Sequence, residues 1–232
     1  MAIPLRDALK LGPLVLIIFM SRPSWSDETT TSPHDRNCHA AAELFCAIGN
    51  FDNVKLSKLV STGLDVNAHG PKGGYEGTDP DVPDLPLCLA VRLGNLDAVH
   101  ILIEHHADVN GDCFGSSPLS EAAGEGQEQA LDYLLDHGAN PNKIDTDNYP
   151  LSPLMHCAYG PNGKPNDRGV QRRMLKRLLA AGANPTYVLT DMRWKGRTAL
   201  SIAEGTDTND VVMAQMLRRA IKQWKNHHGA PE

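Results

Sequence analysis

Aromatic side chains are scarce in this sequence, at 5% of its 232 residues. Their scarcity argues against a β-sandwich, because strands favour bulky aromatic and β-branched side chains. Frequent alanine and leucine instead favour helices that pack closely through small residues. A surplus of positive charge is also missing, since the formal net charge is −6. A nucleic-acid-binding protein usually displays a basic patch, so the composition does not indicate that class of protein.

The common catalytic motifs are absent from the sequence as well. It contains no G-x-x-x-x-G-K-[ST] phosphate loop, no G-x-S-x-G nucleophile elbow and no H-E-x-x-H metal pair. His34, Cys38 and His39 offer half of a zinc site, whereas structural zinc takes four ligands. We therefore expect a protein that is not an enzyme, with no catalytic residue, no cofactor and no metal site.

The longest apolar run, residues 11–20, is shorter than the roughly 20 residues that a membrane-spanning helix needs. Arg6 and Lys10 precede the run, and the small residues Ser24 and Ser26 follow it. This order is typical of a secretory signal peptide. We expect residues 1–26 to be removed and residues 27–37 to form a flexible leader, which places the mature protein in the periplasm or outside the cell. An uncleaved anchor and a misassigned start codon with a cytoplasmic location remain open.

A short turn recurs four times in the rest of the chain. Its copies end at Asn67, Asn110, Asn142 and Thr186, and they read STGLDVN, HHADVN, DHGANPN and AAGANPT. Before each of the last three copies, an apolar pair follows an apolar residue at the spacing of one helix face, as at Leu131 and Leu134-Leu135. Ahead of these helices lie short segments with Pro or Ala in the first turn, three of them preceded by Ser or Thr as an N-cap. The unit is therefore a short helix, a turn, a longer helix and a tight reversal.

The segment SPLSEAAGEGQEQALDYLLDHGANPN, residues 117–142, resembles an ankyrin repeat without gaps. The resemblance extends over about residues 39–221 and implies an all-α ankyrin-repeat solenoid of about five helix-turn-helix repeats with finger loops. The spacing between Asn110 and Asn142 is close to the family period of about 33 residues. The implied domain covers residues 38–226, with repeats near 38–68, 85–111, 115–145, 149–187 and 196–224 and a tail at 227–232.

The sequence departs from the family pattern at the motif histidine, which normally hydrogen-bonds within and between repeats. Cys88, Ser120, Met155 and Ser201 stand in its place. We therefore expect a weaker hydrogen-bond network between repeats, with alanine and leucine packing carrying more of the stability.

The resemblance implies that a partner protein binds the concave face, through side chains that the scaffold does not need. Tyr, Trp and Arg dominate such binding surfaces, and an acidic surround attracts a basic partner. Phe114 and Trp194 have an alternative role, which is to cover the joint beneath their finger. In this family the reversal loops are called fingers, and the short first helices form the palm. The candidate residues are Asp112, Phe114, Asp145, Asp147, Tyr149, Arg193 and Trp194 in the fingers, Tyr75 in an insertion, and Arg92, Glu121, Glu125, His156 and Tyr159 in the palm.

We expect a monomer that binds another protein, with no nucleic acid and no membrane after signal cleavage. One hypothesis is an inhibitor or immunity-type binder of a basic protein. The alternatives are an accessory or scaffold protein for an envelope enzyme, and a secreted effector that imitates host ankyrin scaffolds.

The chain has five cysteines, so at least one cannot pair within it. Cys46 and Cys157 lie at small-residue positions of expected first helices, where cysteine commonly packs as a small hydrophobe. An exported protein can form disulfides. We expect Cys38 to pair with Cys88, which would join the first repeat to the second.

Overall fold

The computed structural model describes residues 42–70, 85–146, 150–160, 168–190, 195–205 and 210–228. The predicted all-α repeat architecture is confirmed, because the described residues form helix pairs and no strand. The first pair joins a helix over residues 42–49 to α2 (Asn53–Ser61). The following pairs are α3 (Pro86–Arg92) with α4 (Leu96–Glu104), α5 (Pro118–Glu125) with α6 (Glu128–Asp136), α7 (Pro153–Tyr159) with α8 (Arg168–Ala180), and α9 (Ala199–Ala203) with α10 (Val211–His228).

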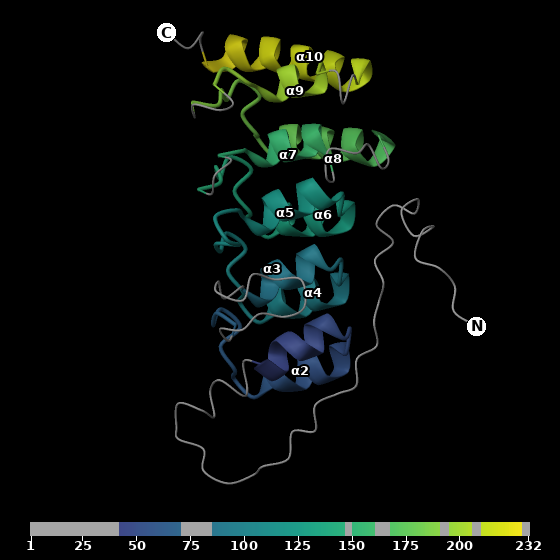
Figure 1. Cartoon of the computed structure of the whole chain (residues 1–232), viewed down its shortest axis with the longest axis vertical. Coiled ribbons are helices and arrows are strands. Elements are labelled where there is room, and N and C mark those ends of the chain that lie inside the picture. Colours follow the sequence, from purple (N-terminus) through teal and green to yellow (C-terminus); the bar gives the residue numbers. More distant parts are fainter. Residues whose placement is uncertain are drawn as a thin grey trace, which may run out of the picture. The chain divides into compact units, whose positions relative to one another are not determined.

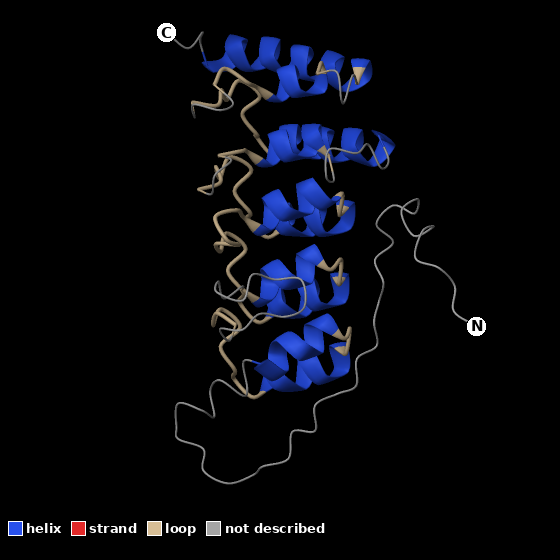
Figure 2. Cartoon of the chain, viewed as in Figure 1, coloured by secondary structure: helices blue, strands red, loops and turns tan. Residues whose placement is uncertain are grey.

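The pairs stack in chain order (Figure 1). Each first helix contacts the first helix of the next pair, from α3 to α9, and each second helix contacts the next second helix, from α2 to α10. Two layers of helices result, with short turns at one edge and the longer finger loops at the other (Figure 2). Because each pair touches only its neighbours, the core grows along the stack. In the described part of the chain, none of the helices is long and apolar enough to cross a bilayer.

The first helices start where the sequence predicts them. The side chains of Ser117, Ser152 and Thr198 each accept a hydrogen bond from the backbone N–H three residues on. Proline occupies the first turn of α3, α5 and α7, where its missing N–H costs nothing. The caps fix the start of α5, α7 and α9 and therefore the end of the finger loop before each of them.

Most apolar residues predicted to share one helix face are buried between the layers, and Leu59, Leu135 and Leu179 are partly buried. Leu131 and Leu134 of α6 are fully buried, as are the equivalent residues of α4 and α8. Burial of one leucine side chain contributes about 2 kcal/mol. Such residues are the reason why an isolated pair would not be stable and why the pairs stack.

Asparagine side chains link successive turns at three joints. At each joint the asparagine amide oxygen accepts a hydrogen bond from the backbone N–H of the next turn at 2.7 Å, and its NH₂ group donates to a carbonyl of that turn. The three acceptor–donor pairs are Asn67 with Asp108, Asn110 with Asn140, and Asn142 with Asn184. In addition to the packing of alanine and leucine, this asparagine ladder therefore connects the repeats.

The fourth joint is built differently, because Thr186 stands where the ladder would continue. There, the buried carboxylate of Asp210 caps α10 by accepting from the Met213 N–H at 3.0 Å, and Arg172 donates to the same carboxylate at 2.9 Å. Burial by itself raises the pKa of Asp210. The hydrogen bonds from Arg172 and Met213 and the charges of Arg172 and Arg168 outweigh it, so the pKa lies below its ordinary value.

Two expectations need correction, one about the burial of a cysteine and one about where the last helix ends. Cys46 is exposed on the first helix and does not fill a core position, whereas Cys157 is buried as expected. The helix α10 extends to His228, two residues into the segment expected as a tail. The expected signal peptide (1–26) and leader (27–37) lie outside the described residues.

Candidate protein-binding site

The finger between α4 and α5 ends in a two-residue hairpin. The backbones of Cys113 and Ser116 exchange two hydrogen bonds, of 3.0 and 3.1 Å, across Phe114 and Gly115. Both central residues have positive φ, +56° and +88°. This conformation is typical of a type I′ turn, in which Asn and Gly are the preferred residues. Phenylalanine is an uncommon choice at such a φ, so the backbone at Phe114 is strained.

The Phe114 ring packs against an arginine of the palm. The guanidinium carbon of Arg92, at the end of α3, lies 5.5 Å from the ring centroid, within range of a cation–π interaction. Arg92 Nε is also 3.5 Å from a carboxylate oxygen of Glu121 on α5. The other oxygen of Glu121 accepts a hydrogen bond from Ser116 Oγ at 2.6 Å. Two successive repeats and the finger between them thus hold one aromatic ring in place.

A disulfide fastens this finger to the palm from below. Cys113 at the base of the hairpin is bonded to Cys88 of α3, with 5.5 Å between their Cα atoms. Both cysteines are fully buried and form a small apolar cluster with Leu85, separate from the main core. The expected pairing of Cys38 with Cys88 is therefore wrong, because the hairpin brings Cys113 directly to Cys88. Cys38 lies outside the described residues.

Asp145 belongs to the scaffold and does not form part of an open binding surface. It is 4% exposed, against the expectation of a finger residue that meets a partner. Ser120 Oγ donates to one carboxylate oxygen at 2.9 Å, and His156 Nε2 lies 2.5 Å from the other. Ser120 occupies the position of the family histidine, so that position still makes a hydrogen bond between repeats. The replacement of histidine by serine at position 120 indicated that the hydrogen-bond partner would differ. No residue near Ser120 in the sequence indicated that this partner would be Asp145.

The other candidate residues in the described ranges reach the surface to different degrees. Asp112, Glu125 and Tyr159 are exposed, while Arg92, Phe114, Glu121 and His156 are half-buried. Asp112 also accepts a hydrogen bond from the Gly115 N–H at 3.0 Å, so it supports the hairpin as well. The candidates Tyr75, Asp147, Tyr149, Arg193 and Trp194 lie outside the described residues.

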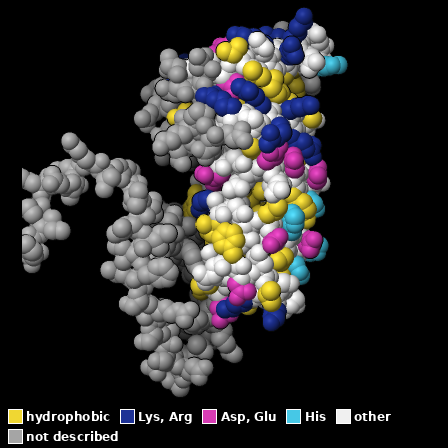
Figure 3. Space-filling model, turned by 90° about the vertical axis from the view of Figure 1, so that its right-hand side faces the viewer, with side chains coloured by type: hydrophobic (Ala, Val, Ile, Leu, Met, Phe, Trp, Pro, Cys, Tyr) yellow, Lys and Arg dark blue, Asp and Glu magenta, His cyan; other side chains and the backbone are white. Residues whose placement is uncertain are grey.

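Charge is divided along the array. Residues 42–70 and 85–146 contain thirteen acidic and four basic residues, whereas residues 168–190, 195–205 and 210–228 contain two acidic and eleven basic residues. In Figure 3, Lys and Arg side chains gather at the upper end, where α8 and α10 lie, and Asp and Glu side chains lie below them. The finger with Phe114 therefore belongs to the acidic part.

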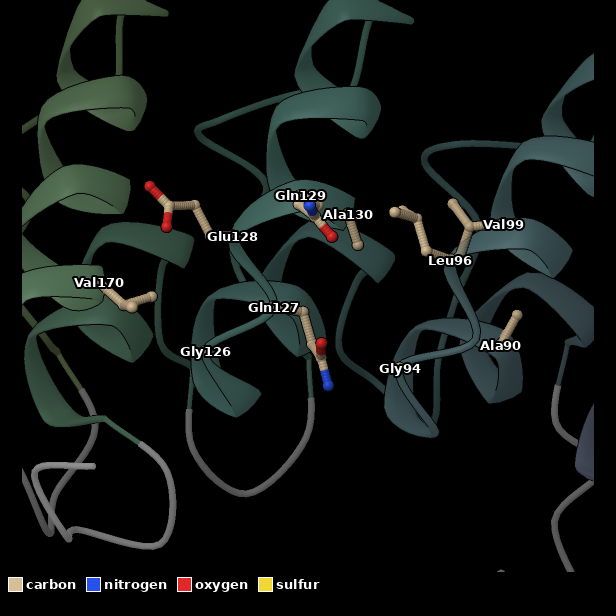
Figure 4. A pocket seen from close by; sticks show the side chains of 10 residues that line it. All are labelled: Ala90, Gly94, Leu96, Val99, Gly126, Gln127, Glu128, Gln129, Ala130 and Val170. Atoms are coloured by element: carbon tan, nitrogen blue, oxygen red, sulfur yellow. The ribbon is translucent and has the colours of Figure 1, made fainter. Parts of the chain in front are cut away.

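A cavity of about 300 Å³ lies among the short turns, at the edge away from the fingers (Figure 4). Of its ten lining residues only Glu128 is ionisable, and its carboxylate makes two hydrogen bonds of 2.7 Å to Arg173 of α8. The remaining lining side chains are small, apolar or amide. This notch at the joint between repeats therefore offers no free acid, base or nucleophile.

The buried thiol of Cys157 is expected to be unreactive. Burial raises the pKa of Cys157, and a hydrogen bond from a backbone N–H only partly opposes this. Its S–H donates to the Gln171 carbonyl at 3.1 Å. A protonated, fully buried thiol does not act as a nucleophile. Within the described ranges, no three His, Cys, Asp or Glu side chains are grouped so that they could hold a metal ion.

The sequence profile described as ankyrin repeats (3 copies) matches residues 39–145 and, in a second placement, residues 87–188. Together the two matches cover more than half of the chain. No curated protein shows significant sequence similarity to it. Ankyrin-repeat proteins are generally modules for protein–protein interaction and are typically not enzymes. With its stacked helix pairs and its profile match, this chain belongs to the ankyrin-repeat family.

Proposed function

We propose that the protein is a non-enzymatic binder that holds a basic protein against one surface of its second to fourth helix pairs. We call this the palm-and-finger surface, and it consists of Arg92, Asp112, Phe114, Glu121, Glu125, His156 and Tyr159. The observation that carries the proposal is the position of Phe114. A large aromatic ring lies at a finger tip, on a strained backbone, and is held over Arg92.

Asn would fit the turn at Phe114 at lower cost, but strain alone does not mark a site, because Phe51 has the same φ. What distinguishes Phe114 is the set of contacts that holds its ring. The surroundings keep the ring fixed through a disulfide, a cation–π contact and the Ser116–Glu121 hydrogen bond. A fixed aromatic residue binds a partner with little loss of conformational entropy. Aromatic and arginine side chains are also the most frequent binding hot spots. Phe114 and Arg92 are therefore the centre of the proposed contact.

The charge around this centre selects the partner. Asp112 and Glu125 are exposed beside Phe114 and Glu121, and the repeats that carry them are strongly acidic. Such a surface attracts a basic protein and repels an acidic one. We further propose that the bound protein is inactivated by being covered, as an immunity-type inhibitor does with a toxin, and that one copy of the chain suffices.

Export is part of this proposal. The N-terminal pattern of residues 1–26 supports it, and so does the Cys88–Cys113 disulfide, because disulfides persist mainly outside the reducing cytoplasm. The test is the N-terminal sequence of the protein recovered from its own cells. A mature chain beginning at Asp27 in the periplasm or medium is expected, whereas a chain that retains Met1 in the cytoplasm would contradict export.

The binding proposal can be tested with immobilised protein and an extract of its own cells. The wild-type chain should retain one or more basic proteins, and Phe114→Asn should lose them. The matched control is Phe51→Asn, because Phe51 has the same φ of +56° but lies in a short turn of the first pair, away from the fingers. Retention of the same proteins by Phe114→Asn, or retention of acidic proteins only, would contradict the proposal.

A further inference from the structure

We propose that α8 and α10 form a second docking surface, which binds an acidic segment of another protein. It differs from the palm-and-finger surface in position and in charge. The surface consists of Lys176 on α8 and Arg219, Lys222 and Lys225 on α10, and we call it the basic end. The protein would then hold a basic partner and an acidic partner at the same time.

The first argument is that these positive charges have no carboxylate partner among the described residues. Other arginines of α8 and α10 are neutralised, since Arg173 binds Glu128, Arg172 binds Asp210 and Arg218 binds Glu204. The four residues of the basic end are exposed and make no ion pair with any carboxylate of the described residues. The α10 sequence itself contains no acidic residue. The array thus keeps a concentrated positive charge that its own fold does not use.

The second argument is the arrangement of these charges. Arg219, Lys222 and Lys225 follow one another at intervals of three residues, which places them along one side of the helix. They extend over about 10 Å, the length of three to four residues of an extended chain. At the start of the same helix, about two turns before Arg219, Val211 and Val212 are 58% and 46% exposed. A short segment with acidic and apolar side chains matches both features.

The same surroundings argue against the other polyanions. A membrane surface would need a row of apolar side chains to insert, but Met213, Ala214 and Leu217 are buried against the array. Of the large apolar residues of α10, Val211 and Val212 alone are exposed, at one end of the helix. A nucleic acid longer than the basic end would reach the acidic repeats. Their carboxylates would repel its phosphates and oppose binding. A short acidic protein segment can end before those repeats begin.

The test uses the full-length protein and a fluorescein-labelled 12-residue peptide that contains eight glutamates and four alanines. Fluorescence anisotropy gives the Kd at low and at moderate salt. We expect Lys222→Glu with Lys225→Glu to weaken binding about tenfold. The matched control is Lys55→Glu with Lys58→Glu on α2, because these lysines are also exposed, also three residues apart and change the net charge equally. The control should stay within about twofold of wild type.

Circular dichroism must show that both double variants unfold at the wild-type temperature. The less severe pair Lys222→Gln with Lys225→Gln gives an intermediate Kd if the basic end is the site. Equal weakening by both charge-reversal pairs, or no peptide binding by the wild type, would overturn the proposal. Tighter binding of duplex DNA or of phosphatidylserine vesicles at equal charge concentration would also overturn it. Because Phe114→Asn leaves the basic end intact, it should not change peptide binding even if the palm-and-finger proposal fails.

Discussion

The side-chain oxygen of Asn110 lies 2.7 Å from the backbone nitrogen of Asn140, in the next turn of the array. The Asn110 NH₂ group completes the contact by donating to the Gly138 carbonyl at 3.2 Å. One side chain therefore satisfies a donor and an acceptor of the neighbouring repeat. This contact explains why the turn keeps Asn as its last residue in three of its four copies.

Replacing Asn110 by Ala should destabilise the array by about 1–2 kcal/mol, because two backbone groups lose their partner. Urea unfolding followed by circular dichroism measures this change. Asn226→Ala, an exposed asparagine of α10 away from the ladder, is the control and should stay within about 0.5 kcal/mol of wild type. Equal stability of both variants would mean that water replaces the ladder at no cost.

Replacing Phe114 by Asn should separate stability from binding. The variant relieves strain of about 1–3 kcal/mol and loses a cation–π contact of about 1 kcal/mol, so it should be as stable as wild type or more stable. Affinity for the basic partner should fall about thirtyfold or more, as for a hot-spot residue. Phe51→Asn should gain stability as well but keep its affinity. Thermal unfolding and titration calorimetry with the captured partner give the two quantities.

Replacing both Cys88 and Cys113 by Ala should lower the free energy of unfolding by about 3 kcal/mol, since their bond closes a loop with a sequence separation of 25 residues. The finger should also lose its fixed position. Urea unfolding, with and without reductant, measures the effect. The wild type should respond to the reductant and the double variant should not. If the reductant opens the disulfide but leaves the urea midpoint of the wild type unchanged, the disulfide does not stabilise the fold.

The two remaining described cysteines should differ in reactivity. In a Cys38→Ser variant, iodoacetamide under native conditions should label Cys46, which is exposed, well before Cys157, which is buried with a raised pKa. Peptide mapping by mass spectrometry identifies the labelled site. Labelling of Cys157 at the rate of Cys46 would show that α7 and α8 open frequently.

Asp210 should make the last joint sensitive to acid. Its pKa is lowered in the folded protein, so its stabilisation is present above the unfolded pKa of about 3.9 and is lost as pH falls through the folded pKa. Asp210→Asn should therefore cost about 2 kcal/mol at pH 6, and this difference should shrink below about pH 4. Unfolding curves between pH 6 and 3 test this, with the exposed Glu104→Gln as control. A difference that is constant with pH would exclude the carboxylate as its source.

Local patterns were enough to predict the repeat unit. The N-caps Ser117 and Ser152 and the leucines of α6 depend on residues three or four positions apart, and the structure places them as expected. The turn ending in Asn142 was also recognisable. Its reach to Asn184 in the next repeat was not, because that bond depends on how two pairs stack.

The site was harder to predict than the scaffold for the same reason. Asp145 looks like a free loop carboxylate in the sequence, but folding brings it within hydrogen-bond distance of Ser120, 25 residues earlier. Cys88 had several possible partners, and only the hairpin at Phe114-Gly115 shows why Cys113 is the one. The hairpin had a local signal, because Gly115 suits the second central position of a two-residue turn. This signal predicts a turn but does not show that Cys88 lies beside it.

The asparagine ladder also bears on how the length of such a protein can change. Its oxygen-to-nitrogen distance is the same at three successive joints, so each repeat presents the same connector above and below. A duplicated copy of residues 111–142 could join the array through the same asparagine contacts. Gene duplication could thus lengthen the protein one repeat at a time. Each added repeat would move the Cys88–Cys113 finger and the basic end further apart.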